Sequence, residues 1–315
     1  MISQGLPPDE QASLGTPQID ARDHYRRGFI ERWAYATFFA GLICTTSAPI
    51  LMRLSDVGPL ATAAWRTTLA VPVLALFLCF EPREVRTIGG LRRKDVGLLI
   101  LAGLFFAGDL AMWNSSVMLT SVASASFLTN GAPVFVVLGS WILFKERPTG
   151  MFLVGLTVGI GGSALMMSES LEMSPRNFLG DLFSVVAALF YALYLLAVSR
   201  ARKRTSTMTL MTVSSAVSAG ALWLMAMILE TELAPSTGSG WLVLVSTALL
   251  THVAGQTLIA LSLGYVSANF SALILLLQPV IPTLAAWILF DETLGAVQAV
   301  GALGIVIGLA LARPR

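Results

Sequence analysis

This sequence has few charged residues and few of the side chains that most enzymes use. Asp, Glu, Lys and Arg make up 12% of its 315 residues, against about a quarter in a typical soluble domain. Two cysteines and two histidines are too few for a disulfide framework or a repeated metal motif. There is no HExxH, phosphate-binding loop or CxxC sequence. We therefore expect no cofactor, no bound metal and no nucleic-acid partner.

One possible function is that of a membrane-embedded enzyme. We do not favour it, because its chemistry would depend on Asp109, Arg66 and His252 alone. Small proton-driven multidrug pumps carry a carboxylate in the middle of the first helix of their unit. The first and sixth apolar runs of this sequence contain none there, so that mechanism does not carry over. A channel is a third alternative.

Long apolar runs separate the few charge clusters. Hydrophobic residues make up 56% of the chain, and the mean hydropathy is +0.77. Runs of about 18 to 24 residues are long enough for a helix to cross about 30 Å of hydrocarbon. We predict an all-α integral membrane protein with ten transmembrane helices and the lipid bilayer as a partner. The spans are expected at 34–54, 58–80, 96–118, 121–144, 150–168, 180–199, 208–229, 241–263, 267–290 and 294–312.

The first 32 residues differ from the rest of the chain. They are polar and rich in Pro, Gly and Gln, and lack the apolar core of a cleaved signal peptide. This composition predicts a disordered cytoplasmic tail over residues 1–32.

Basic residues alternate across the predicted spans. With the N-terminus inside, 17 of the 20 Lys and Arg residues fall on inner segments, and only Arg53 and Arg176 fall on outer ones. The excess of basic residues in cytoplasmic loops predicts a multi-pass protein of the plasma membrane, the inner membrane in bacteria, with both termini cytoplasmic.

One sequence phrase occurs twice. Residues 141–146 read WILFKE and residues 287–292 read WILFDE. The same offset places Pro133 on Pro279. Because a unit of five spans has an odd number of crossings, its second copy is inverted in the membrane. We predict two such repeats, residues 33–168 and 169–315, in the arrangement typical of secondary transporters that work by alternating access.

These phrases, a Gly-rich closing helix in each half, Arg66 within AAWR and the run GDLFSVVAALFYALYLLAVSRAR resemble the EamA domain. That domain is the five-helix repeat of the drug/metabolite transporter superfamily. The resemblance implies ten helices around a central cavity, lined by the first, third and fourth spans of each half, with the fifth spans packed behind. It also implies export of amino acids or related small metabolites, with aromatic amino-acid exporters of the YddG type as the functional model. A proton-coupled multidrug or other metabolite transporter is the alternative.

Two ionisable residues lie deep in predicted spans. Arg66 and Asp109 are each about 12 to 14 Å below the outer surface, if a helix rises 1.5 Å per residue. Charges at this depth are costly and need a reason. They form either a structural pair or a site for the charged ends of a zwitterion, and Asp109 is also the candidate carrier of a coupled proton.

Other polar and aromatic side chains gather on the spans expected to line the cavity. A hydrogen bond between helices explains any single one of them better than a substrate contact does, but their concentration predicts a wet cavity. The candidate substrate-binding residues are Asp109, Trp113, Asn130, Tyr191, His252, Gln256 and Gln278.

Prolines and glycines predict how the helices bend and pack. Pro133 and Pro279 remove a backbone hydrogen bond at matching positions and are candidate hinges. Small-xxx-small pairs at 155–159 and 304–308 predict close packing of the fifth span on the tenth. The alternative use of these pairs, an oligomer interface, is less favoured, so we expect a monomer.

The repeated glutamates, Glu146 and Glu292, each precede a predicted span. A carboxylate there would stabilise the unpaired N–H groups of the helix N-terminus. The alternative is that they form gate ion pairs, Glu146 with cytoplasmic arginines.

Overall fold

The computed structural model describes residues 21–81, 93–168, 177–281, 283–284 and 295–313. Every element of regular secondary structure in these ranges is helical, as the sequence predicts. The helices of the first half are α2 (Ala21–Thr45), α3 (Ala48–Arg53), α4 (Pro59–Phe80), α5 (Arg93–Leu119), α6 (Val122–Thr129), α7 (Ala132–Phe144) and α8 (Gly150–Met167). Those of the second half are α9 (Phe178–Ala201), α10 (Thr207–Leu229), α11 (Gly238–Ser246), η4 (Thr247–Gln256), α12 (Thr257–Ser262), α13 (Ala268–Ile274), η5 (Leu275–Leu277) and α15 (Ala296–Leu311).

Eight helical stretches in the described ranges are long and apolar enough to span a membrane. They correspond to the first eight predicted spans. The last two predicted spans contain shorter apolar helices, Ala268–Leu277 and Ala296–Leu311. A helix of 16 residues is only about 24 Å long, and most of the second part of the predicted span 267–290 lies outside the described residues. The all-helical membrane architecture is confirmed, and the count of ten full-length spans stays a prediction.

Several predicted spans are not continuous α-helices in the described residues. The first divides into α2 and α3, and the fourth divides into α6 and α7 at Asn130 and Gly131. A proline lies in the first turn of the second piece in both cases, Pro49 in α3 and Pro133 in α7. Because proline has no N–H, it fits a helix start but interrupts a helix that would continue through it. The eighth span contains η4, a π-helix of 10 residues.

The first described helix begins within the segment predicted to be a disordered tail. Helix α2 begins at Ala21, so the prediction of disorder is wrong for residues 21–32. The segment ARDHYRRGFIER contains four arginines, and arginine has a high helix propensity. A polar extension of the first apolar span can therefore continue its helix.

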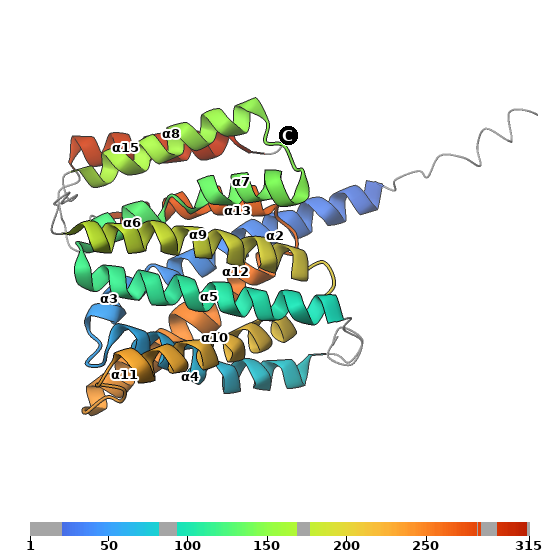
Figure 1. Ribbon diagram of the computed structural model, residues 1–315. Coiled ribbons are helices and arrows are strands. Elements are labelled where there is room, and N and C mark those ends of the chain that lie inside the picture. Colours follow the sequence, from blue (N-terminus) through green and yellow to red (C-terminus); the bar gives the residue numbers. More distant parts are fainter. Residues whose placement is uncertain (1–20, 82–92, 169–176, 282, 285–294, 314–315) are drawn as a thin grey trace, which may run out of the picture.

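The helices run roughly side by side, with α8 and α15 along one edge of the bundle and α4, α10 and α11 along the opposite edge (Figure 1). α5 and α9 pack closely along each other, as do α4 and α10. Arg200, Arg202 and Arg204 lie where α9 ends, and we name that end of the bundle the basic end. The other end is where α2 and α8 finish and α15 begins.

The two glycine-rich helices pack on each other. A Cβ added to Gly162 would lie 2.6 Å from the carbonyl oxygen of Gly301, and one added to Gly308 would lie 2.5 Å from that of Gly155. Real side chains do not approach this closely, so these positions admit only glycine at the observed spacing. The prediction of internal packing between the fifth and tenth spans is confirmed. This glycine surface is covered within the chain.

Candidate functional site

A cavity of about 500 Å³ lies within the bundle, and we name it the central cavity. This volume is in the range of small-molecule sites. Its wall comes from α2, α3, α4, α5, α6, α7, α9, η4 and η5, and from the ends of α8 and α15. The contributions of Met166, Met167 and Gln298 come from the end of the bundle opposite the basic end. The cavity therefore extends from the middle of the spans toward that opposite end.

Most of the site residues predicted from the sequence lie on the wall of the central cavity. These are Arg66, Asp109, Trp113, Asn130, Pro133, Tyr191, Gln256, Gln278 and Pro279. They are spread over 214 positions of the sequence, and the fold brings them to one volume. Substrate binding by these residues and hinge motion at the two prolines stay predictions.

Arg66 and Asp109 face the same cavity from α4 and α5. Both are buried, with 5% and 7% of their surface exposed, and each lies in the electrostatic field of the other. Among the described residues, direct ion pairs join Arg200 to Glu146 and Arg204 to Asp95, and none joins Arg66 to Asp109. A basic and an acidic side chain thus line the same cavity without a direct ion pair between them.

Three buried polar atoms on the wall have no hydrogen-bond partner among the described residues. They are Nε of Arg66, Nδ2 of Asn130 and Oε1 of Gln256. Buried polar groups in folded proteins are nearly always satisfied, so each exception needs an explanation. Because all three belong to residues that line one cavity, a polar molecule or water within the cavity would satisfy them.

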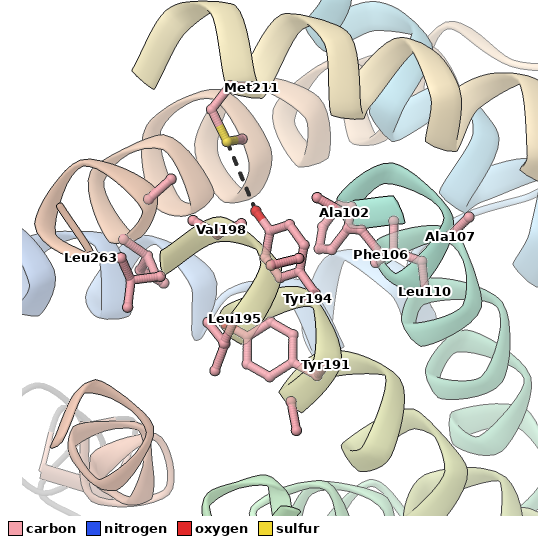
Figure 2. Close-up of a cluster of buried hydrophobic side chains, with 14 of the residues drawn as sticks. Ala102, Phe106, Ala107, Leu110, Tyr191, Tyr194, Leu195, Val198, Met211 and Leu263 are labelled. Atoms are coloured by element: carbon pink, nitrogen blue, oxygen red, sulfur yellow. Dashed lines mark hydrogen bonds between the residues drawn. The ribbon is translucent and has the colours of Figure 1, made fainter. Parts of the chain in front are cut away.

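An aromatic cluster supports this charged wall from behind. The guanidinium carbon of Arg66 lies 5.8 Å from the ring centre of Phe106, and the Phe106 ring lies 4.7 Å from that of Tyr194. Figure 2 shows Phe106 on α5 directed toward Tyr191 and Tyr194 on α9. Tyr194 is buried and donates its hydroxyl to the sulfur of Met211 at 3.8 Å, whereas Tyr191 reaches the cavity. The two tyrosines therefore differ in role although they lie on adjacent turns.

His252 is the one predicted site residue that is not on the cavity wall. It is fully buried, its Nε2 lies 2.7 Å from Oγ of Ser215, and its ring lies 5.2 Å from Phe106. His252 and Gln256 are four residues apart, which would place them on one face of an α-helix. Both belong to the π-helix η4, in which His252 contacts Ser215 rather than the cavity. Only Gln256 reaches the cavity.

Helix interruptions place several polar residues on the wall. Asn130 is the last residue before the α6–α7 break, and Gln278 follows η5 and precedes Pro279. Since Pro133 has no N–H, the carbonyl of Thr129 has no donor at the usual position in the next turn. Non-helical backbone at membrane depth is tolerated where it lines a polar space, and both breaks adjoin the central cavity.

The structure adds wall residues that the sequence did not suggest. They include Thr45, Thr46, Met166, Met167, Thr283 and Gln298. The ends of the fifth and tenth spans therefore reach the cavity, although the resemblance implied that these spans lie behind it. Gln298 was visible as an isolated polar residue within an apolar run. The threonines were not distinctive, because a threonine in a helix can bond its own backbone, as Thr45 and Thr46 do.

At the basic end of the bundle, the contact that Glu146 makes differs from the predicted one. The cap of α8 is Thr149, whose hydroxyl accepts the N–H of Phe152 at 3.2 Å. Glu146 instead accepts a bond from Arg200 at 2.8 Å, and the Arg200 guanidinium lies 3.5 Å from the ring centre of Phe144. The helix-cap prediction is therefore wrong for Glu146, and the alternative contact with an arginine is the one observed. Glu292 lies outside the described residues.

Comparison with known proteins relates both halves of the chain to one family. The model of the EamA-like transporter family matches residues 32–168 and again residues 178–313. An uncharacterized transporter from Archaeoglobus fulgidus is 27% identical over 248 residues, which cover 78% of this chain and 86% of that protein. A crystal structure with 19% identity has a TM-score of 0.75 and covers 90% of this chain and 97% of that chain. At that identity the likeness shows the fold alone.

Proposed function

This chain belongs to the EamA-like transporter family, and we propose that it exports amino acids or closely related small metabolites across the plasma membrane. Its family and its membrane-spanning helices support transport of a small molecule. The proposal of an amino acid rests on one observation, that Arg66 and Asp109 face one cavity without pairing directly.

An α-amino acid carries the complementary charges on neighbouring atoms. Its carboxylate can accept two parallel hydrogen bonds from the Arg66 guanidinium, the strongest geometry for that pair. Its ammonium group can donate to Asp109, and the amides of Asn130 and Gln256 can complete the polar contacts. Trp113, Met166 and Met167 offer apolar surface for the side chain of the substrate.

Alternating access between two inverted repeats is the proposed mechanism. The double match of the family model supports a duplicated chain. Both direct ion pairs described above join one matched half to the other, Glu146 to Arg200 and Asp95 to Arg204, and both lie at the basic end. The central cavity extends toward the other end. With the basic end in the cytoplasm, as the distribution of Lys and Arg favours, this conformation is closed to the cytoplasm and faces outward.

Charge-selective binding tests the amino-acid proposal. Detergent-purified protein is screened by thermal shift against a panel of free amino acids, their amides and their N-acetyl derivatives, because a ligand that binds only the folded state raises the apparent stability. We expect free amino acids to stabilise the wild type most. Arg66→Gln should abolish the preference for the acid over the amide, and Asp109→Asn the preference for the free amine over the N-acetyl form.

The control is Arg53→Gln, which removes an exposed arginine of α3 outside the cavity wall. It should keep both preferences. Equal stabilisation of the wild type by all three ligand forms would refute the proposed recognition of a zwitterion. So would a loss of binding to all forms in both cavity variants.

A further inference from the structure

A second cavity, of about 290 Å³, lies beside the α6–α7 break, and we name it the lateral cavity. Its wall comes from α6, α7, α8, α9 and η5. Asn130 and Ser163 are its two polar residues, and the other wall residues are apolar. It is separate in character from the central cavity, which carries charged groups.

The lateral cavity opens to the side of the bundle rather than to either end. Val134 and Val185 are exposed residues of its wall. Val134 lies at the middle of the membrane-spanning stretch Ser124–Phe144, and Ile160, a half-buried wall residue, lies within Gly150–Met167. The opening between α7 and α9 is therefore near the middle of the bilayer.

The surroundings at this depth decide what can occupy the lateral cavity. In the middle of a bilayer, the molecules next to an open side cavity are lipid acyl chains. A buried water typically makes about three hydrogen bonds, and this wall offers two polar side chains, Asn130 and Ser163, among apolar residues. These two could hold one water molecule but not fill an apolar cavity of about 290 Å³ with water. An empty cavity would leave its wall atoms without dispersion contacts. We propose that the lateral cavity binds the end of one acyl chain of a bilayer phospholipid.

The proposed lipid would contact the elements that build the central cavity. Asn130 is on the wall of both cavities. Leu276 lines the lateral cavity and its neighbour Leu275 lines the central one. A bound chain end would thus lie against the α6–α7 break and against η5, on the side away from the substrate. Acyl-chain length and saturation become variables that act on the position of Asn130.

Photolabelling measures occupancy directly. The full-length protein is reconstituted in phosphatidylcholine liposomes that contain a small fraction of phosphatidylcholine with a diazirine near the end of one acyl chain. After irradiation, peptides are mapped by mass spectrometry. Ile160, which is half-buried in the lateral cavity, should be labelled about tenfold more than Leu189, a lipid-facing residue of α9, which corresponds to a preference of about 1.4 kcal/mol.

A pair of variants on one helix face separates bound lipid from ordinary lipid contact. Val185→Trp places a large ring at the opening of the lateral cavity, and Leu189→Trp places the same ring one turn away, at an exposed position outside its wall. Val185→Trp should reduce labelling of Ile160 to the level of general lipid-facing positions, and Leu189→Trp should leave it unchanged. Equal melting temperatures and elution volumes of the two variants show that both are folded.

Two results would overturn the proposal. One is labelling of Ile160 in the wild type no greater than that of Leu189, which would mean general contact with the bilayer only. The other is labelling of Ile160 that persists in folded Val185→Trp. Val134→Trp, on the facing rim of the opening, replaces Val185→Trp if the latter does not fold.

Discussion

The α8–α15 interface and the central cavity are opposite kinds of packing in one helical bundle. The first brings two backbones close together, and the second leaves a space lined by buried polar groups. At the interface, glycines let two backbones approach until a Cβ at Gly162 or Gly308 would overlap a carbonyl oxygen. In the cavity, Arg66, Asn130 and Gln256 each keep one buried polar atom without a hydrogen-bond partner among the described residues. Lipid gives helices little hydrophobic reason to associate, so they are held by close packing. The close packing of interfaces such as this one can offset the free-energy cost of polar groups that are left unsatisfied in the cavity.

The largest expected effect comes from breaking the close interface. Gly162→Leu should abolish folding or leave a protein that elutes as aggregate, since overpacking costs about 1–3 kcal/mol even where some adjustment is possible and here the neighbour is backbone. Gly161→Leu is the matched control, because a Cβ at Gly161 meets nothing within 4 Å. Fluorescence-detected size-exclusion chromatography measures the folded fraction. Equal folded fractions for the two variants would show that the glycine contact is not needed.

The second largest effect is expected when the ionisable side chains of the central cavity are replaced by apolar ones. The double variant Arg66→Met with Asp109→Leu should be more stable than the wild type by about 1–4 kcal/mol, because replacing buried charges by apolar groups removes their desolvation cost. Transport of any substrate found in the binding screen should be lost. Thermal unfolding in detergent and uptake in liposomes are the two measurements. A variant that is less stable than the wild type would mean that the charges serve the fold rather than the substrate.

The smallest effect is expected at the basic end. Glu146 and Arg200 are partly exposed, 52% and 30% at the side chain, and exposed ion pairs contribute about 0.2–1 kcal/mol. Glu146→Gln should therefore lower the melting temperature slightly and leave the transport rate per folded molecule nearly unchanged. Arg204→Gln, which removes the longer ion pair with Asp95, is the comparison variant. A large loss of rate in Glu146→Gln at normal stability would assign this ion pair to the transport cycle.

The sequence predicted the membrane class and the first eight spans because length and apolarity are local properties of the chain. It also predicted the packing of the fifth span on the tenth, since a small-xxx-small pattern has one main use between helices in lipid. Most of the cavity residues were predicted for a similar reason. A charged or amide side chain in the middle of an apolar span is costly to expose to lipid, so it is expected to face the interior of the bundle.

Two expectations differ from the contacts that the fold makes. Spacing grouped His252 with Gln256, but in η4 His252 contacts Ser215 and only Gln256 lines the central cavity. Glu146 was assigned to the helix that follows it in sequence. In the structure Glu146 instead pairs with Arg200, which is 54 residues away in sequence. The N-cap of α8 is Thr149.

Composition, spacing and charge distribution by themselves determined that this chain is a helical membrane protein with a repeated phrase and a few costly polar residues in its spans. Those features are set by the free energy of transferring each residue into hydrocarbon, which does not depend on the neighbours of the residue in the fold. Only the tertiary structure decided that Arg66 and Asp109 share a cavity without touching. It also decided that Met166 and Gln298 belong to the wall of the central cavity and that a lateral cavity shares Asn130 with it. These features depend on how broken helices from both halves pack, and packing distances of a few ångströms are not encoded in any single segment.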